Sequence, residues 1–224
     1  PLGPDVIRYW QRYPVTEVTR LDAQTLAGLL HKVEKPARYT GGELNQIVKE
    51  HADVRVALCF PDVYEIGMSH LGSRILYHIL NELDGVACER AFAPWPDFEA
   101  VLREEKLPLF SLETKRPLGA FEVVGFSLLY EMCYTNILAM LDLSGIPLFS
   151  RDRGENDPLV IAGGPCACNP EPVAAFFDAV LLGDGEEVFP EFVRAVQKAG
   201  ADKLSRTETL RLLSGIAGVY IPSY

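Results

Sequence analysis

The residues of this sequence that could perform chemistry gather in short segments, each of which follows an apolar run. Cys166 and Cys168 stand two positions apart, and His70 follows Ser69. Cysteine and histidine are the common ligands of zinc and other borderline metals, and cysteine is also a nucleophile. A Cys-x-Cys pair with no further Cys or His nearby in the sequence does not complete a metal site. We therefore expect the two thiols to line a loop, where they could respond to redox conditions.

Two glycine-rich turns also follow apolar runs. Gly163-Gly164-Pro165 comes after residues 159–162, and Gly183-Asp184-Gly185-Glu186-Glu187 comes after residues 179–182. A double glycine lets the backbone adopt positive φ and lets a flat or bulky ligand approach without a Cβ in the way. The second turn opens a predicted helix, whose free N–H groups favour anionic or acceptor groups. Taken singly, each turn is equally well explained by the geometry of a strand-to-helix connection.

Familiar catalytic patterns do not occur in the sequence. It contains neither the phosphate-binding G-x-x-x-x-G-K-[ST] nor the dinucleotide-binding G-x-G-x-x-G. The apolar run at 54–60 is followed by neither an adjacent acidic pair nor a hydroxyl-rich phosphate loop. No nucleophile–base pair stands at a diagnostic spacing, which disfavours a free-standing hydrolase. This segment therefore shows no catalytic motif of its own.

An alternation of apolar strands and amphipathic helices positions these segments. Strands are predicted at 54–60, 85–92, 121–128, 159–162 and 179–182, with a short extra edge strand at 109–112. Helices are predicted at 69–83, 97–105 (capped by Asp97), 131–144 and 186–199. This alternation is typical of parallel βαβ units with right-handed crossovers and helices on both faces. Five main strands predict an open α/β sheet of the flavodoxin-like, Rossmann-like type with order 2-1-3-4-5.

The first fifty residues differ from this alternation. Residues 5–13 and 22–33 each predict a short helix, the second with Asp22 as its N-cap, and 35–42 predict an ordered loop. Residues 1–3 are interpreted as the remnant of a cleaved tag. We therefore divide the chain into a mostly helical N-terminal extension at 1–52, an α/β domain at 53–204, and a helix with a linker or strand at 205–224. The last segment is expected to lead onward into a further domain.

Composition narrows the classes of partner. The 224 residues are 48% hydrophobic and 23% charged, which is ordinary for a globular protein. No apolar run approaches the roughly 20 residues of a membrane-spanning helix, and no signal-like start is visible. A net charge of −10 argues against a large nucleic-acid surface, which needs clustered Lys and Arg. Five scattered cysteines indicate a reducing compartment, so we expect a cytoplasmic protein.

In open parallel sheets, ligands bind beyond the carboxyl ends of the strands, near the switch in strand order. The sequence places four distinctive segments there: 61–72, 127–131, 163–170 and 183–187. Because parallel strands all end at the same edge, the four segments are expected to form one ligand-binding rim.

Within these segments the sequence resembles a known family. FPDVYEIGMSHLG, VGFSLLYE, PLVIAGGPCACNPEP and DAVLLGDGEEVFPEF, in this order, are similar to the cobalamin (B12)-binding domain that precedes the catalytic barrel in B12-binding radical S-adenosylmethionine (SAM) proteins. Residues 33–224, including KVEKPARYTGGE and FAPWPDFE, resemble more narrowly an uncharacterised bacterial branch of these proteins. The resemblance implies an accessory domain that holds a corrinoid on the strand-end loops.

The resemblance also implies a catalytic partner. SAM and a [4Fe–4S] cluster would belong to a C-terminal radical SAM domain of the same polypeptide, where three cysteines in Cys-x-x-x-Cys-x-x-Cys hold the cluster. That spacing does not occur in this chain.

Residues of each strand-end segment are implied to bind the cofactor. They are Asp62, Gly67, Ser69 and His70 after the first strand, Ser127 and Leu128 after the third, Gly163, Gly164 and Pro165 after the fourth, and Gly183, Asp184, Gly185 and Glu186 after the fifth. Family members that ligate cobalt through histidine carry Asp-x-His-x-x-Gly, whereas this chain has Asp62-Val63-Tyr64. His70 is the remaining histidine nearby, and it is either a cobalt ligand or a hydrogen-bonding residue at the start of a helix.

The missing lower histidine and the acidic balance leave an alternative open. The domain could have lost its ligand and act as an interaction module that covers the catalytic domain or recruits a substrate such as tRNA or another protein. Side chains of Tyr64, Trp95 or Tyr130 blocking the rim would favour this alternative. Trp95 lies between two prolines, where it either packs as a plug or covers the rim.

Overall fold

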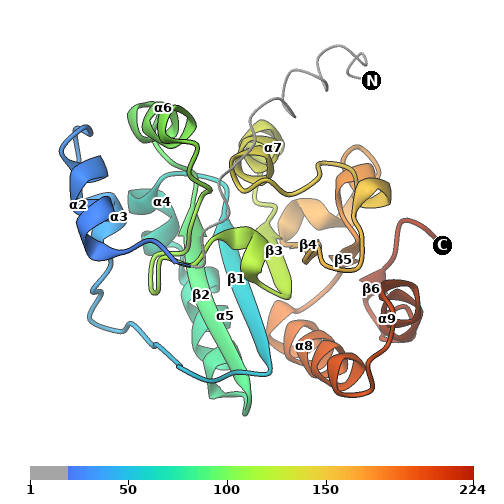
Figure 1. Ribbon diagram of the computed structural model, residues 1–224. Helices are drawn as coiled ribbons and strands as arrows, with labels where there is room; N and C mark the ends of the chain where they lie inside the picture. Colours follow the sequence, from blue (N-terminus) through green and yellow to red (C-terminus); the bar gives the residue numbers. More distant parts are fainter. Residues whose placement is uncertain (1–19) are drawn as a thin grey trace.

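A six-stranded sheet with the order β2-β1-β3-β4-β5-β6 forms the centre of the computed structural model, which describes residues 20–224 (Figure 1). The strands are β1 (Val54–Phe60), β2 (Val86–Phe92), β3 (Val123–Ser127), β4 (Leu159–Gly163), β5 (Ala179–Leu181) and β6 (Val219–Tyr220). The first five pair in parallel, so the predicted open α/β sheet of order 2-1-3-4-5 is confirmed. The sixth is a short antiparallel strand that pairs with β5.

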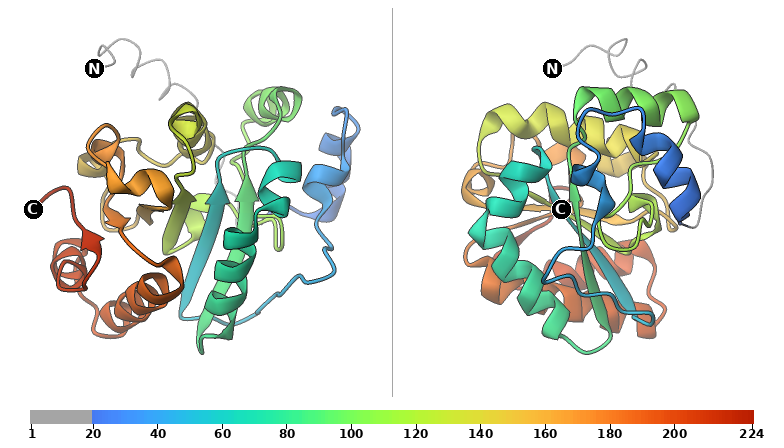
Figure 2. Two further views of the ribbon diagram at one scale, coloured as in Figure 1. Left: turned by 180° about the vertical axis from the view of Figure 1, so that it is seen from behind. Right: turned by 90° about the vertical axis from the view of Figure 1, so that its left-hand side faces the viewer.

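Helices cover both faces of the sheet (Figure 2). Helices α2, α6 and α7 pack on one face, and α5, α8 and α9 pack on the other. Their bounds, with those of the short α3 and α4, are α2 (Ala23–Leu30), α3 (Ala37–Thr40), α4 (Tyr64–Ser69), α5 (Leu71–Glu82), α6 (Pro96–Glu105), α7 (Tyr134–Leu143), α8 (Gly185–Ala201) and α9 (Arg206–Leu213).

The two cores arise from the side-chain alternation of the strands. In β1, Ala57 and Cys59 face the layer of α6 and α7, while Val56 and Leu58 face the layer of α5 and α8. Because both faces of the central strands are covered, they read as continuous apolar runs in the sequence. These runs explain why the positions of the central strands could be predicted from the sequence.

The structure differs from the sequence-based expectations at several local points. The loop expected at 35–42 contains α3, and the loop after β1 contains α4 ahead of the predicted helix. Asp97 does not cap α6, because Pro96 takes the first helical position that proline favours and Trp95 is the N-cap. The expected strand at 109–112 forms a single bridge, Phe110 to Pro117, outside the main sheet. The helix expected at 5–13 lies outside the described residues.

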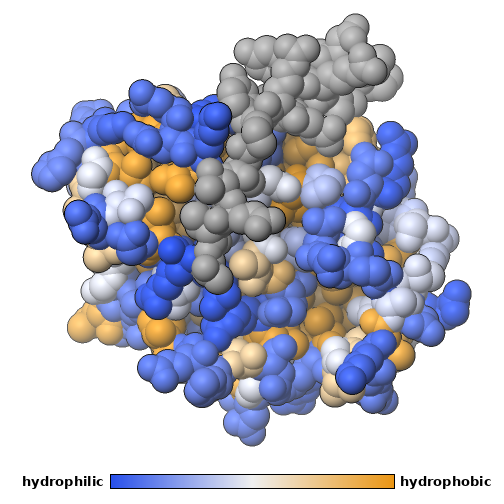
Figure 3. Space-filling model, in the orientation of Figure 1, coloured by the Kyte–Doolittle hydropathy of each residue, from blue (hydrophilic) through white to orange (hydrophobic). Residues whose placement is uncertain are grey.

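The described part of the N-terminal extension packs against the α/β domain, at α6. Leu26 and Leu29 of α2 are buried with α6, and the backbone N–H of Glu34 donates to Oδ2 of Asp97 at 2.8 Å. In Figure 3, apolar side chains show between α2 and α6, and further apolar patches lie among the hydrophilic side chains of the same face. Among residues 20–224, no helix has the length and apolar character needed to cross a bilayer.

Candidate functional site

A cavity of about 240 Å³ lies at the carboxyl edge of the sheet, beside the N-terminal ends of α5 and α8. We call it the slot. Its floor is formed by Leu58, Gly125 and Ile161, which are lateral neighbours in the pairing of β1, β3 and β4. Leu76 of α5 and Phe189 of α8 form its walls. The slot is therefore largely apolar and lies where an open parallel sheet binds ligands.

The space in the slot depends on Gly125. A Cβ atom at this position would lie 3.2 Å from Cζ of Phe189 and 3.4 Å from Cγ1 of Ile161. The sequence analysis did not select Gly125, Leu76 or Phe189. A glycine inside an otherwise β-branched strand indicates close approach of another group, and that signal could have identified Gly125.

The loops after β3 and β4 lie against each other at the mouth of the slot. The backbone N–H of Leu128 donates to the carbonyl of Gly163 at 2.7 Å, and that of Cys166 donates to the carbonyl of Leu128 at 3.0 Å. Gly164 has φ +114°, and a Cβ there would lie 2.9 Å from the Leu128 carbonyl oxygen. Backbone geometry thus requires glycine at 164.

Seven of the thirteen predicted site residues line the slot. They are His70, Ser127, Gly163, Gly164, Pro165, Gly183 and Gly185. The structure thus brings together residues from the ends of β3, β4 and β5 and from the start of α5. These elements are far apart in the sequence.

The other six predicted residues lie outside the slot. Gly67 packs α4 tightly against Phe92, and Oγ of Ser69 donates to the carbonyl of Glu65 at 2.7 Å. Asp184 is the N-cap of α8, and Glu186 follows in the first turn. Leu128 is fully buried and contributes only its backbone to the mouth.

Asp62, the sixth, forms a bridge across the rim. The hydroxyl of Tyr130 donates to Oδ2 of Asp62 at 2.8 Å and so connects the loops after β1 and β3. This hydrogen bond raises the pKa of Tyr130. The hydroxyl of Tyr64 instead donates to Glu43, and Trp95 stacks under Arg38 with the guanidinium 4.9 Å from its ring. None of these three aromatic residues lines the slot.

His70 caps α5 through its ring. Its Nδ1 accepts a hydrogen bond from the backbone N–H of Ser73 at 3.1 Å. Nδ1 also lies 2.9 Å from Oγ of Ser73. Both contacts hold the ring at the start of α5, which fits the hydrogen-bonding interpretation of His70.

The cysteine pair lies in a short 3₁₀ helix, Pro165–Cys168, beside the mouth. Cys166 is half-buried and Cys168 is exposed, and both are free thiols. Partial desolvation raises the pKa of Cys166, which lowers its thiolate fraction. Within residues 20–224, no three His, Cys, Asp or Glu side chains are arranged to hold a metal ion.

Comparison with known protein families identifies the family to which the region around the slot belongs. Residues 72–222, from the first turn of α5 to just beyond β6, match the family described as "Radical SAM proteins, N-terminal". The chain belongs to this radical SAM family. The matched range holds β3, β4 and β5, and with them most of the slot. No curated protein and no solved structure matches the chain. The family match therefore places the slot in the N-terminal region of a radical SAM protein. Proteins of this class use SAM and an iron–sulfur cluster.

Proposed function

We propose that this chain is an accessory, cofactor-binding region of a radical SAM protein, and that the slot holds the flat nucleotide base of a cobalamin-type cofactor. The corrin ring would lie outside on the strand-end loops, between this chain and a catalytic radical SAM domain of the same polypeptide. The observation that carries the proposal is the apolar, glycine-lined slot between β1, β3, β4 and β5.

The size and lining of the slot support this use. Pockets for whole drug-sized ligands span roughly 300–1,000 Å³. At about 240 Å³, the slot suits one planar part of a larger molecule. Gly125 and Gly164 remove side chains from its floor and mouth, and Leu76 and Phe189 supply apolar surface for a ring. Ser127, His70 and Ser73 are polar side chains of the lining that can orient that ring.

We assign the cobalt no side-chain ligand from the described residues of this chain. Tyr64 stands where the cobalt-ligating motif carries histidine, and the ring of His70 contacts Ser73 through Nδ1 at the start of α5. When bound, the corrinoid would supply cobalt-centred chemistry to the catalytic domain. The role of this chain is to bind and orient the cofactor.

Hydroxocobalamin tests the proposal. The chain is mixed with excess hydroxocobalamin, passed through a desalting column, and its visible spectrum is compared with that of the free cofactor. We expect cofactor to stay with the protein and its spectrum to shift. No retention and no spectral change would refute the cobalamin assignment.

One observation favours the alternative, a ligand-free interaction module. The Tyr130–Asp62 bridge closes the rim between β1 and β3, where strand order switches. Close to it in the chain, Met132 is 84% exposed. In this case the rim itself would contact the catalytic domain. Binding of a separately expressed radical SAM domain to the cobalamin-free chain, abolished by Met132→Glu, would support the module.

A further inference from the structure

A second and larger cavity lies between residues 43–47 and α5, and it shares no lining residue with the slot. Its volume is about 750 Å³. We call it the α5 groove. Leu71, Ile75 and Ile79 of α5 give it an apolar wall, Arg74 and His78 lie along the same helix, and Arg90 of β2 also lines it.

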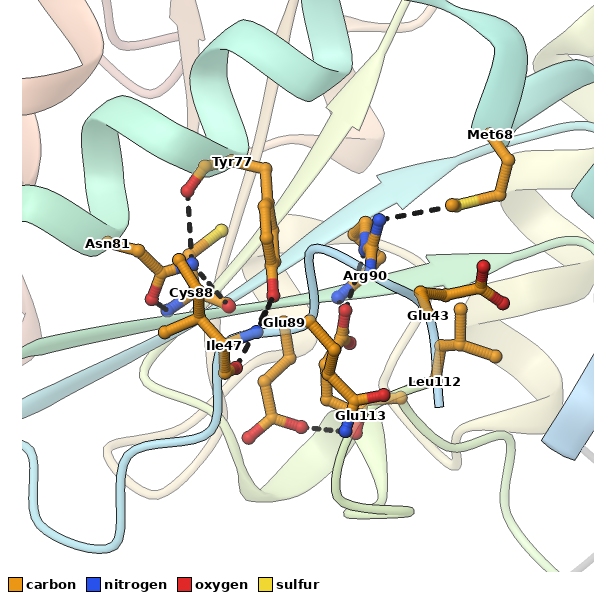
Figure 4. A network of polar contacts seen from close by, with 12 residues as sticks. Glu43, Ile47, Met68, Tyr77, Asn81, Cys88, Glu89, Arg90, Leu112 and Glu113 are labelled. Carbon is orange, nitrogen blue, oxygen red and sulfur yellow. Dashed lines mark hydrogen bonds and ion pairs between the residues drawn. The ribbon is translucent and has the colours of Figure 1, made fainter. Parts of the chain in front are cut away.

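Arg90 is an unusual residue to find there, because its side chain is only 8% exposed. Its Nε donates to Oε1 of Glu113 at 2.6 Å, and its guanidinium lies 4.3 Å from the centre of the Tyr77 ring. Nη1 contacts the thioether sulfur of Met68 at 3.3 Å (Figure 4). Among the described residues, Nη2 has no hydrogen-bond partner at all.

The terminal edge of this guanidinium therefore lacks a strong acceptor. A thioether is a weak acceptor, and buried polar groups are seldom left without a partner. Glu113 does not supply it: its Oε1 accepts from Nε and its Oε2 from the backbone N–H of Arg90, and neither oxygen bonds to Nη2. The paired Nη groups of arginine match the two oxygens of a carboxylate. Met68 is flexible enough to move aside for such a group.

The charges around Arg90 point to a ligand with a single negative charge. Arg55, Arg90 and Lys115 are the cationic side chains of this buried cluster, and Glu89 and Glu113 are its carboxylates. Glu43 lines the groove and is a third carboxylate, and its Oε1 accepts a hydrogen bond from the Tyr64 hydroxyl at 2.6 Å. Arg74 of α5 also lines the groove and is a fourth cation, so the four cations exceed the three carboxylates by one charge. A monoanion would balance this charge, whereas a dianion such as phosphate would add repulsion from the carboxylates.

We propose that the α5 groove binds an organic monocarboxylate with an apolar body. The carboxylate of this ligand accepts hydrogen bonds from Nη1 of Arg90, where it displaces the Met68 sulfur, and from the unpartnered Nη2. The apolar part of the ligand lies along Leu71 and Ile75. The carboxylate can belong to a free acid or to the C-terminus of a peptide, since both present the same group.

Matched pairs of probes test for the carboxylate. Binding of octanoate and octanamide to the 224-residue chain is measured by calorimetry, and N-acetyl-leucine and its amide serve as mimics of a peptide C-terminus. We expect each acid to bind about tenfold or more tightly than its amide, because a charged acceptor is exchanged for a neutral one. The tighter of the two acids identifies the source. Equal binding of acids and amides would overturn the proposal.

Variants locate the binding. Ile75→Trp fills the groove on the half-buried face of α5 without touching the Arg90–Glu113 pair, and it should abolish octanoate binding while the far-ultraviolet circular dichroism stays unchanged. Arg90→Lys removes the paired Nη groups but keeps the positive charge, and it should weaken octanoate binding about tenfold. Arg211→Gln on α9 is the control and should bind as the parent does.

The Nε–H signal of Arg90 in ¹⁵N–¹H spectra gives a direct readout even if Arg90→Lys folds poorly. Octanoate should shift this signal in the parent chain, and octanamide should not. Octanoate binding that persists in Ile75→Trp, or that leaves the Arg90 signal in place, would show a different site and overturn the proposal.

Discussion

A Cβ atom on Gly125 would lie 3.2 Å from Cζ of Phe189, a separation tighter than ordinary van der Waals contact. Gly125 belongs to β3 in the middle of the sheet, and Phe189 comes from the second turn of α8. The absence of one side chain from the strand leaves the slot open beneath the helix. The proposed cofactor site thus depends on the relation between these two residues.

Gly125→Val should close the slot. The two added methyl groups would point toward Phe189 and Ile161, so we expect retention of hydroxocobalamin to fall at least about tenfold. Phe189 and Ile161 must shift slightly to admit the new side chain, so far-ultraviolet circular dichroism and urea unfolding check that the variant is folded. Gly28→Ala in α2 is the matched control, since nothing lies within 4 Å of its added Cβ. Equal retention by the two variants in the desalting assay would remove the slot from the binding site.

The two neighbouring glycines at the mouth should respond differently to alanine. Gly164 has φ +114° and would press its Cβ against the Leu128 carbonyl, so Gly164→Ala should lower the free energy of unfolding by about 1–3 kcal/mol. A Cβ on Gly163 meets Leu181 at an ordinary 3.6 Å, so Gly163→Ala should cost less than about 1 kcal/mol. Urea unfolding of both variants gives the comparison, and similar losses would contradict it.

The sequence predicted the sheet well because its central strands are buried on both faces. Leu58 in β1 and Ile161 in β4 each stand in a short apolar run, which is typical of a strand covered on both faces. The rim was predicted only in part. Asp62 and Gly67 follow β1 as expected, yet one forms a bridge to Tyr130 and the other packs a short helix that periodicity did not reveal. Such contacts depend on how loops meet, which spacing along one chain does not encode.

Asp178 should be a strong determinant of stability. Its Oδ2 accepts from Nη1 of Arg153 at 3.0 Å, from Nη2 of Arg206 at 2.8 Å and from the backbone N–H of Val160 at 2.8 Å. The Arg153 side chain is completely buried, and burial lowers its pKa. Asp178→Asn leaves that charge without its counter-ion and should cost about 3–5 kcal/mol in urea unfolding. Asp152→Asn, at an exposed pair, should cost less than about 1 kcal/mol. Comparable losses in the two variants would contradict the assignment.

Lys115 should make stability depend on alkaline pH. Burial lowers the pKa of this amine to about 8 from its ordinary value of 10.5. Between these values the unfolded chain holds a proton that the folded chain has released, so the contribution of Lys115 to stability increases as pH rises. Below pH 8 both states are protonated and that contribution is constant. The free energy of unfolding of the parent minus that of Lys115→Met should therefore grow from pH 8 to pH 10. A flat or falling difference would contradict the burial of a charged amine here.

The Tyr130–Asp62 bridge should resist entry of a bulky cofactor. Tyr130 is half-exposed at the rim, and the bridge must open if a corrin ring rests on the loops after β1 and β3. Tyr130→Phe removes the hydroxyl and keeps the ring, so it should speed hydroxocobalamin association, followed by stopped-flow absorbance. Tyr220→Phe removes a similar surface hydrogen bond, to Glu171, and should leave the rate unchanged. Slower association in Tyr130→Phe would mean that the hydroxyl contacts the ligand instead.

The central claim is that the slot holds the nucleotide base of a cobalamin-type cofactor. It is tested most directly by comparing cobalamin with cobinamide, which has the corrin ring but no nucleotide, in the same desalting experiment. The account predicts that the chain retains cobalamin and loses cobinamide. Equal retention of both corrinoids, or retention of neither, would contradict it.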